Sequence, residues 1–103
     1  MSLDSIAIPG NIVTVNGSHH SEEIFTFTIS TCIWCKKGKR WLEERGFQYS
    51  YLDIDKIPVE EKNQLKGEIK RIFGVDPRFP FLVVNKTNYH SGYNPNVWGK
   101  MLE

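Results

Sequence analysis

Hydrophobic and polar positions in the first half of the chain predict short β-strands. Residues 24–29 (IFTFTI) place Phe and Ile side chains on one face and Ile and Thr on the other, which is typical of a strand. Residues 48–54 carry a similar mixture of aromatic and aliphatic side chains, and residues 12–15 form a shorter segment rich in β-branched residues. Asn16-Gly17 follows that shorter segment and is a dipeptide typical of hairpin turns.

A helix is predicted directly after the IFTFTI strand. Ser30 and Thr31 can cap it, and it is expected to begin near Cys32. It runs to Arg45 and stops at Gly46, because glycine is favoured just beyond a helix end.

The second half of the chain predicts two helices and two strands. A helix opens at Pro58, and its apolar residues follow the spacing of one buried stripe. Residues 81–84 are continuously apolar, as expected of a buried central strand, and residues 89–91 can return antiparallel to it. Asn94 is a good N-cap and Pro95 a good first residue for a short final helix.

The predicted order β-α-β-α-β-β-α indicates an α/β fold with a mixed four-stranded sheet and helices on both faces. Strands that flank one helix are expected to be parallel, and the last pair antiparallel. Residues 24–103 form a single domain in this interpretation, and residues 1–23 are an N-terminal extension that can add a further strand.

Composition narrows the classes of function. The chain has 103 residues, of which 40% are hydrophobic and 24% are charged, with a formal net charge of +1. The charge argues against a nucleic-acid binder that relies on bulk charge. No apolar run is long enough for a membrane span, and the first residues lack the features of a signal peptide. We therefore expect a cytoplasmic monomer with no nucleic-acid or membrane partner.

The chain has 2 cysteines, Cys32 and Cys35, which form a C-x-x-C at a predicted strand–helix junction. Two are too few for a disulfide framework or a four-thiolate zinc site. Backbone N–H groups and the positive end of the helix dipole favour the thiolate of Cys32, which identifies it as the attacking residue. Cys35 lies one turn later and is expected to be the less exposed, resolving thiol.

Other interpretations of the cysteines stay open. They can be two buried, inert residues. A metal site would need further ligands, and the candidates His19, His20 and His90 have no ligand-like spacing to the cysteines. An iron–sulfur cluster held between two subunits would make the chain a non-catalytic cluster carrier or binding module.

Four basic residues follow the dithiol: Lys36, Lys37, Lys39 and Arg40. They can supply a positive field that favours a thiolate and attracts anionic thiols or disulfides. They can equally form a solvated helix face. Lys36 and Lys37 are the nearer pair in sequence.

These features together resemble a glutaredoxin, within the thioredoxin fold, over roughly residues 24–102. Trp34 gives the C-I-W-C an aromatic third residue, where the family commonly has Tyr or Phe, and Ile33 stands where many members have Pro. Gly38 and Lys39 match a small residue and a Lys of the family's helix, and FQYSYLDIDK resembles its second strand with a D-I-D ending.

Two later segments extend the resemblance. Phe79-Pro80 resembles the family's V-P segment, which implies a cis bond that leaves the Phe79 backbone free to bind an extended thiol. Ser91-Gly92-Tyr93-Asn94 resembles the G-G-x-D stretch, where backbone N–H groups hold a carboxylate. Phe79, Ser91 and Asn94 depart from the family pattern on the surface where glutathione lies in the family.

The resemblance implies a thiol–disulfide oxidoreductase that reduces protein or small-molecule disulfides, with Cys32 and Cys35 as catalytic residues. No cofactor or metal is expected to be bound, and a small thiol such as glutathione or coenzyme M is the co-substrate. An alternative is a thioredoxin-like electron donor to one protein partner, regenerated by a flavoprotein reductase. The expected substrate-binding residues are Trp34, Lys36, Lys37, Phe79, Pro80, Gly92, Tyr93 and Asn94.

Overall fold

A mixed sheet of five strands organises residues 2–103, the part of the chain that this computed structural model describes. The strands lie side by side in the order β1-β3-β2-β4-β5. They are β1 (Val13–Val15), β2 (Ile24–Thr28), β3 (Tyr49–Asp53), β4 (Phe81–Val84) and β5 (Asn88–Ser91). The helices are α1 (Ile33–Glu44), α2 (Val59–Phe73) and α3 (Pro95–Leu102), with short 3-10 turns η1 (Leu3–Ser5) and η2 (Ile54–Lys56). The predicted thioredoxin-like α/β fold is confirmed.

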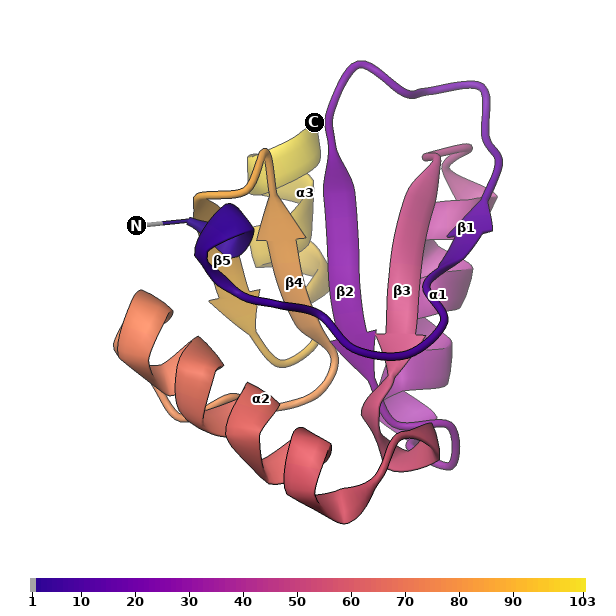
Figure 1. Cartoon of the computed structure of the whole chain (residues 1–103). Helices are drawn as coiled ribbons and strands as arrows, with labels where there is room; N and C mark the ends of the chain where they lie inside the picture. Colours follow the sequence, from indigo (N-terminus) through magenta and orange to yellow (C-terminus); the bar gives the residue numbers. More distant parts are fainter. Residues whose placement is uncertain (1) are drawn as a thin grey trace.

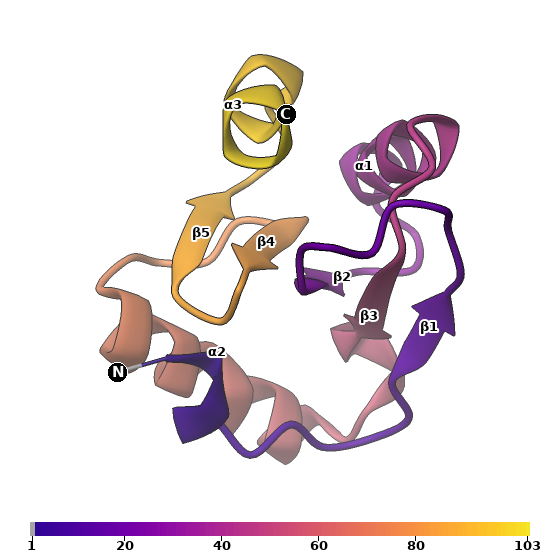
Figure 2. The same cartoon turned by 90° about the horizontal axis from the view of Figure 1, so that it is seen from above.

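Different helices cover the two faces of the sheet: α2 lies on one face, and α1 and α3 lie on the other (Figures 1 and 2). The alternation within β2 explains this arrangement. Phe25 and Phe27 point toward α2 and pack in one apolar cluster with Ile69. Ile24 points the other way and packs in a second cluster with Trp98 of α3. Both cores thus share one central strand.

The predicted parallel direction is right for the two strands that flank α1 and wrong for the two that flank α2. β2 and β3 flank α1 and are parallel, as expected. β3 and β4 flank α2, but β4 is antiparallel to β2 and hence to β3, so the parallel arrangement expected there is wrong. In Figure 1, α2 crosses the strands on its face of the sheet instead of running back along β3, so the chain enters β4 at the end of the sheet where β3 finishes. β4 and β5 are antiparallel, as predicted.

The first residues cross the α2 face of the sheet and supply its fifth strand (Figures 1 and 2). We call residues 3–15 the N-terminal strap. It starts beside the turn between β4 and β5, where the Leu3 N–H donates to the Lys86 carbonyl oxygen at 2.8 Å. Ile6 is buried in the α2-side core, and β1 pairs antiparallel with β3. Asn16-Gly17 therefore does not close a hairpin with the next strand, contrary to its turn signal.

The ends of the elements differ from the predictions by about one residue. α2 begins at Val59, with Pro58 as its N-cap rather than its first helical residue. β3 ends at Asp53 because the next residue enters η2. Asn94 is the N-cap of α3 with a proline in the first turn, as predicted. Among the helices described for residues 2–103, none combines the length and the apolar character needed to cross a membrane.

Candidate active site

Cys32 is the N-cap of α1, the position directly before the helix begins. Its backbone is extended, and its Sγ accepts a hydrogen bond from the Cys35 backbone N–H at 3.4 Å. The predicted caps, Ser30 and Thr31, do not occupy this position, and Ser30 instead donates its backbone N–H and its hydroxyl to the Asp55 carboxylate. The Cys32 sulfur thus takes the place of a capping oxygen and receives a first-turn N–H group.

Cys35 has no exposed surface, whereas Cys32 is partly exposed. Its Sγ accepts a hydrogen bond from the Ile29 backbone N–H at 3.4 Å. Burial raises the pKa of the Cys35 thiol to about 12; the Ile29 N–H opposes this rise, Cys32 adds to it and Lys39 opposes it. The two cysteines therefore differ sharply in access to solvent, although they lie in the same helical turn.

The Phe79–Pro80 peptide bond is cis, as the family resemblance implied. Cys32 Sγ lies 3.9 Å from the Phe79 carbonyl oxygen. The Phe79 N–H has no hydrogen-bond partner within residues 2–103. The backbone of Phe79 therefore forms a wall beside the partly exposed sulfur, and its N–H is unpaired within the described residues.

A left-handed glycine joins this wall to the start of α3. Gly92 has φ +91°, a conformation that glycine adopts without steric cost. Its N–H donates to the carbonyl oxygens of Arg78 at 3.2 Å and Pro80 at 3.0 Å. Its own carbonyl oxygen accepts from Trp98 Nε1 at 3.2 Å. The N–H of Gly92 is therefore used inside the protein, and the residue shapes the turn.

The side chain of Asn94, the residue directly before α3, caps the start of this helix. Asn94 Oδ1 accepts from the N–H groups of Asn96 at 3.1 Å and Val97 at 3.3 Å. These donors are consequently not available to an external carboxylate. Within the described chain, the N–H groups of Tyr93 and Asn94 itself have no partner, and the Tyr93 ring packs edge-on against Trp98.

Gly38 is a site residue whose structural role could not be read from the sequence. A Cβ at this position would lie 2.8 Å from Trp98 Cη2 and 3.2 Å from Pro80 Cγ. The glycine thus allows α1, α3 and the cis-proline segment to meet directly behind the dithiol. The signals in the sequence are its match to a small residue of the family's helix and its place one turn after Cys35, on the buried face of the helix.

The basic residues after Cys35 border two hollows along α1, and Arg40 lines both of them. Lys37 Nζ lies 4.6 Å from the centroid of the Trp34 ring, and Lys37 shares a shallow hollow with Tyr93. Lys36 is exposed and borders a different, open hollow along α1, which Lys39 also lines. The Nζ of Lys39 nevertheless turns inward toward the sheet. Lys39 is therefore the lysine of this run that contacts β3, whereas Lys36 and Lys37 are exposed.

Two large apolar side chains lie exposed next to the dithiol. Ile33 is 61% exposed and Trp34 is 54% exposed. Apolar side chains of this size are commonly buried in soluble proteins. They follow Cys32 directly in the chain and lie in the first turn of α1, so the start of this helix presents apolar surface.

A comparison with protein families matches residues 23–88 to the glutaredoxin model. The chain belongs to the glutaredoxin family. Its membership agrees with the C-x-x-C at the start of α1 and with the cis-proline wall beside it. It is thus a glutaredoxin-like redox protein of the thioredoxin fold.

Solved structures of glutaredoxins and related proteins share this fold. A glutaredoxin from Methanosarcina mazei superposes with a TM-score of 0.74 at 24% identity, over 90% of this chain and 88% of that chain. Methanosarcina acetivorans methanoredoxin gives 0.69 at 26% identity, over 81% of this chain and 86% of that chain. The glutaredoxin-like protein NrdH-redoxin from Escherichia coli, which has a thioredoxin-like activity profile, gives 0.57 at 24% identity, over 77% of this chain and 93% of that chain. No curated protein shows significant sequence similarity to this chain.

The histidines of this glutaredoxin form no hydrogen bond with either cysteine within residues 2–103. His90 Nδ1 hydrogen-bonds the Gly92 carbonyl oxygen at 2.8 Å, and the His19 ring packs against Phe47. Residues 2–103 contain no group of three or more histidine, cysteine, aspartate or glutamate side chains placed to hold a metal ion.

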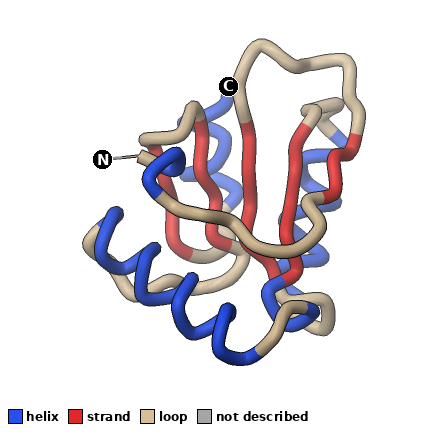
Figure 3. The backbone as a smooth tube through the Cα atoms, viewed as in Figure 1, coloured by secondary structure: helices blue, strands red, loops and turns tan. Residues whose placement is uncertain are grey.

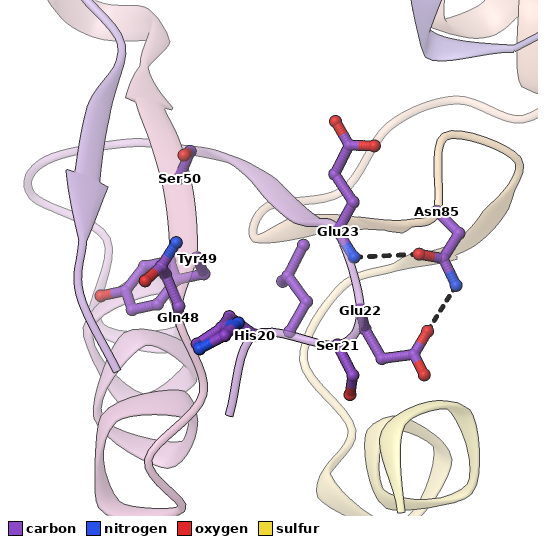
Figure 4. A pocket seen from close by; sticks show the side chains of 9 residues that line it. His20, Ser21, Glu22, Glu23, Gln48, Tyr49, Ser50 and Asn85 are labelled. Carbon is purple, nitrogen blue, oxygen red and sulfur yellow. Dashed lines mark hydrogen bonds between the residues drawn. The ribbon is translucent and has the colours of Figure 1, made fainter. Parts of the chain in front are cut away.

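A separate hollow of about 430 Å³ lies where β2 begins, at the other end of the sheet from the cysteines. Figure 3 shows the long loop over residues 16–23 at this end. Asn85 closes one side, because its side chain accepts from the Glu23 N–H at 2.9 Å and donates to the Glu22 carboxylate (Figure 4). The lining residues are His20, Ser21, Glu22, Glu23, Ile24, Gln48, Tyr49, Ser50 and Asn85. This hollow includes no residue of the predicted site of the glutaredoxin.

Proposed function

We propose that this chain is a thiol–disulfide oxidoreductase in which Cys32 attacks the substrate and Cys35 resolves the intermediate. The observation that carries the proposal is the contrast within one helical turn. Cys32 is partly exposed at the N-cap and receives an N–H group, and Cys35 is buried. An attacking sulfur must reach the substrate, whereas a resolving sulfur only has to reach Cys32.

The reaction proceeds in two exchanges. The Cys32 thiolate attacks one sulfur of a disulfide R–S–S–R′, so that a Cys32–S–S–R bond forms and R′–S⁻ leaves. Cys35 then loses its proton and attacks the Cys32 sulfur, which releases R–S⁻ and leaves a Cys32–Cys35 disulfide. The substrate disulfide has thereby gained two electrons. Two thiol groups of the donor then reduce the Cys32–Cys35 disulfide and restore the dithiol.

A small anionic thiol, glutathione or coenzyme M, is the proposed donor. The free N–H of Phe79 and the cis Pro80 beside it suit an extended thiol, and the N–H groups of Tyr93 and Asn94 suit a carboxylate. Gly92 shapes the turn that presents them. Lys36 and Lys37 supply positive charge near the start of α1, and Trp34 supplies apolar surface.

Reduced dithiols of this kind belong in a reducing compartment, so we assign the protein to the cytoplasm.

The exposure of Ile33 and Trp34 favours a second candidate within the same chemistry. Exposed apolar side chains beside a reactive centre suit a protein surface better than a small anion. In this case the chain acts as a thioredoxin-like electron donor to a protein partner, and a flavoprotein reductase regenerates it.

Single cysteine variants test the assignment of roles. Reduction of a protein disulfide such as that of insulin is expected to disappear in Cys32→Ser. Cys35→Ser is expected to lose this activity but to retain exchange with small mixed disulfides, which requires only the attacking thiol. Full activity of Cys32→Ser would contradict the proposal.

A donor comparison separates the candidates. Turnover of the wild-type chain is measured with glutathione, with coenzyme M, and with NADPH and thioredoxin reductase. Turnover with either small thiol alone supports the first candidate, and turnover with the reductase system alone supports the second. A visible absorption band and iron in the freshly purified protein would instead indicate a cluster carrier.

A further inference from the structure

Lys39 has a different environment from the other basic residues of α1. Its side chain is only 19% exposed, and its Nζ lies 3.4 Å from Asp53 Oδ1 on β3. The same Nζ lies 3.7 Å from the centroid of the Tyr51 ring, which attracts a cation through its face. Lys39 is therefore held between α1 and the sheet rather than extended into solvent.

The carboxylate that holds Lys39 is itself fixed. Asp53 is 11% exposed, and its Oδ1 also accepts the Thr28 hydroxyl at 2.6 Å. Lys56 Nζ approaches the other carboxylate oxygen at 3.9 Å. Enclosing an ion pair costs solvation energy, so this arrangement is a weak argument for stability alone. The fixed, partly buried position of the Lys39 ammonium is therefore better explained by a role in the chemistry of the site than by stability.

The buried sulfur of the dithiol lies at the same end of the sheet. Thr28 is the register partner of Asp53 in the parallel β2–β3 pair. The next residue, Ile29, donates its N–H to Cys35 Sγ. On α1, Lys39 follows Cys35 by four residues, which places both side chains on the same face of the helix. The ammonium and the buried sulfur therefore occupy neighbouring positions beneath α1.

The resolving step needs a negative charge on Cys35. The buried thiol resists ionisation, because burial raises its pKa to about 12, and the charge of Lys39 acts in the opposite direction. From the sheet side, Asp53 and Lys56 are the charged groups near the Lys39 ammonium. On α1 itself, the hollow that Lys39 lines also includes Lys36, Arg40, Glu43 and Glu44. Cys32 lies one helical turn from Cys35 and no longer carries a charge once it is in a mixed disulfide.

We propose that Lys39, positioned by Asp53 and Tyr51, is the cation that stabilises the Cys35 thiolate while the mixed disulfide is resolved. The inference rests on the proposed function and adds a residue to it. In the step concerned, the Cys35 thiol gives its proton to the solvent, and its sulfur forms a bond with Cys32. The bond between Cys32 and the substrate sulfur breaks, and the substrate leaves as a thiolate.

DTNB, a chromogenic aromatic disulfide, measures attack and resolution separately. Attack by Cys32 releases the first coloured thiolate, and attack by Cys35 on the mixed disulfide releases the second. Stopped-flow absorbance follows both releases in the full-length chain as a function of pH. The test variants are Lys39→Gln, which keeps a hydrogen-bonding group but no charge, and Lys39→Arg, which keeps the charge.

The matched control is Lys70→Gln. Lys70 forms an ion pair with Asp76 at 3.1 Å, but on an exposed part of the surface. It lies on α2, and the control should leave both releases unchanged. Should Lys39→Gln not fold, as judged by circular dichroism, Lys39→Met takes its place.

We expect Lys39→Gln to slow the second release about tenfold and to shift its pH profile upward by about one unit. The first release should change by less than about twofold, and Lys39→Arg should restore the second. An unchanged second release and pH profile in Lys39→Gln overturns the role of Lys39, because loss of a purely structural contact would not move the profile. If the wild-type chain releases no coloured thiolate, the proposed function fails, whatever the variants show.

Discussion

Gly38 and Trp98 meet without space for a side chain between them. A Cβ on residue 38 would lie 2.8 Å from Trp98 Cη2, inside normal contact distance. Trp98 in turn donates its indole N–H to the Gly92 carbonyl oxygen, and the Gly92 N–H donates to Pro80. The glycine therefore connects the helix that carries the cysteines with the turn and the cis-proline segment opposite them.

Replacing this glycine should disturb both stability and activity. Gly38→Ala forces Trp98 or Pro80 to move, so we expect the free energy of unfolding to fall by about 1–3 kcal/mol. Displacement of the wall beside Cys32 should lower disulfide reductase activity about tenfold or more. Chemical denaturation and a reductase assay measure the two effects.

Gly67→Ala is the matched control, because an added Cβ on Gly67 in α2 would meet no atom within 4 Å beyond the adjacent backbone of its own helix. It should raise the free energy of unfolding by up to about 1 kcal/mol and leave activity unchanged. Equal behaviour of the two variants would contradict the role given to Gly38.

Two buried threonines on one face of β2 should respond oppositely to the same substitution. Thr26 Oγ1 is buried and has no hydrogen-bond partner among the described residues, whereas Thr28 Oγ1 donates to Asp53 at 2.6 Å. Thr26→Val should therefore stabilise the protein by about 1 kcal/mol, and Thr28→Val should destabilise it by about 1–3 kcal/mol. Urea denaturation of both variants checks the prediction, and destabilisation by Thr26→Val contradicts it.

The reduced protein should lose stability in alkaline solution because of Cys35. Burial raises the pKa of this thiol from 9.0 to about 12. Between these values the unfolded chain has lost the proton that the folded chain retains, so stability falls as the pH rises, by about 1.4 kcal/mol per pH unit from this group. Denaturation under reducing conditions, compared with Cys35→Ala, isolates this contribution. A constant difference between the two proteins across this range would oppose the prediction.

The N-terminal strap should contribute to the stability of the whole domain. Ile6 is buried in the α2-side core, whereas Ile12 in the same segment is exposed. Ile6→Ala should cost about 2–4 kcal/mol of unfolding free energy, and Ile12→Ala less than about 1 kcal/mol. Thermal denaturation with a single transition for each variant tests this. If both substitutions have the same small effect, the strap is not part of the core.

Local sequence signals were sufficient for most of the elements. The alternating IFTFTI segment, the apolar run over residues 81–84 and the Asn94-Pro95 start of α3 all lie where their chemistry predicts. The two cysteines are also found at a strand–helix junction, with Cys35 the more buried of the two. These features depend on residues close together in the chain, which is why the sequence alone could predict them.

Features that depend on distant residues were not predictable in this way. The direction of β4 depends on the path of α2 across the strands on one face of the sheet. The inward turn of Lys39 depends on Asp53, and the partner of Gly38 is Trp98, 60 positions later in the chain. The Asn16-Gly17 signal was misleading because β1 pairs with β3 instead of the strand that follows it. Packing between remote segments decides each of these cases.

The hydrogen bond from the Leu3 N–H to the Lys86 carbonyl oxygen has a consequence for the order of assembly. During synthesis residue 3 leaves the ribosome well before residue 86, so the strap must wait while the strands and α2 beneath it are made. Contacts between such remote positions are slow to form, because a long loop has to close first. We therefore expect the part of this chain that is translated early to be among the last to reach its native place, with Ile6 uncovered until then.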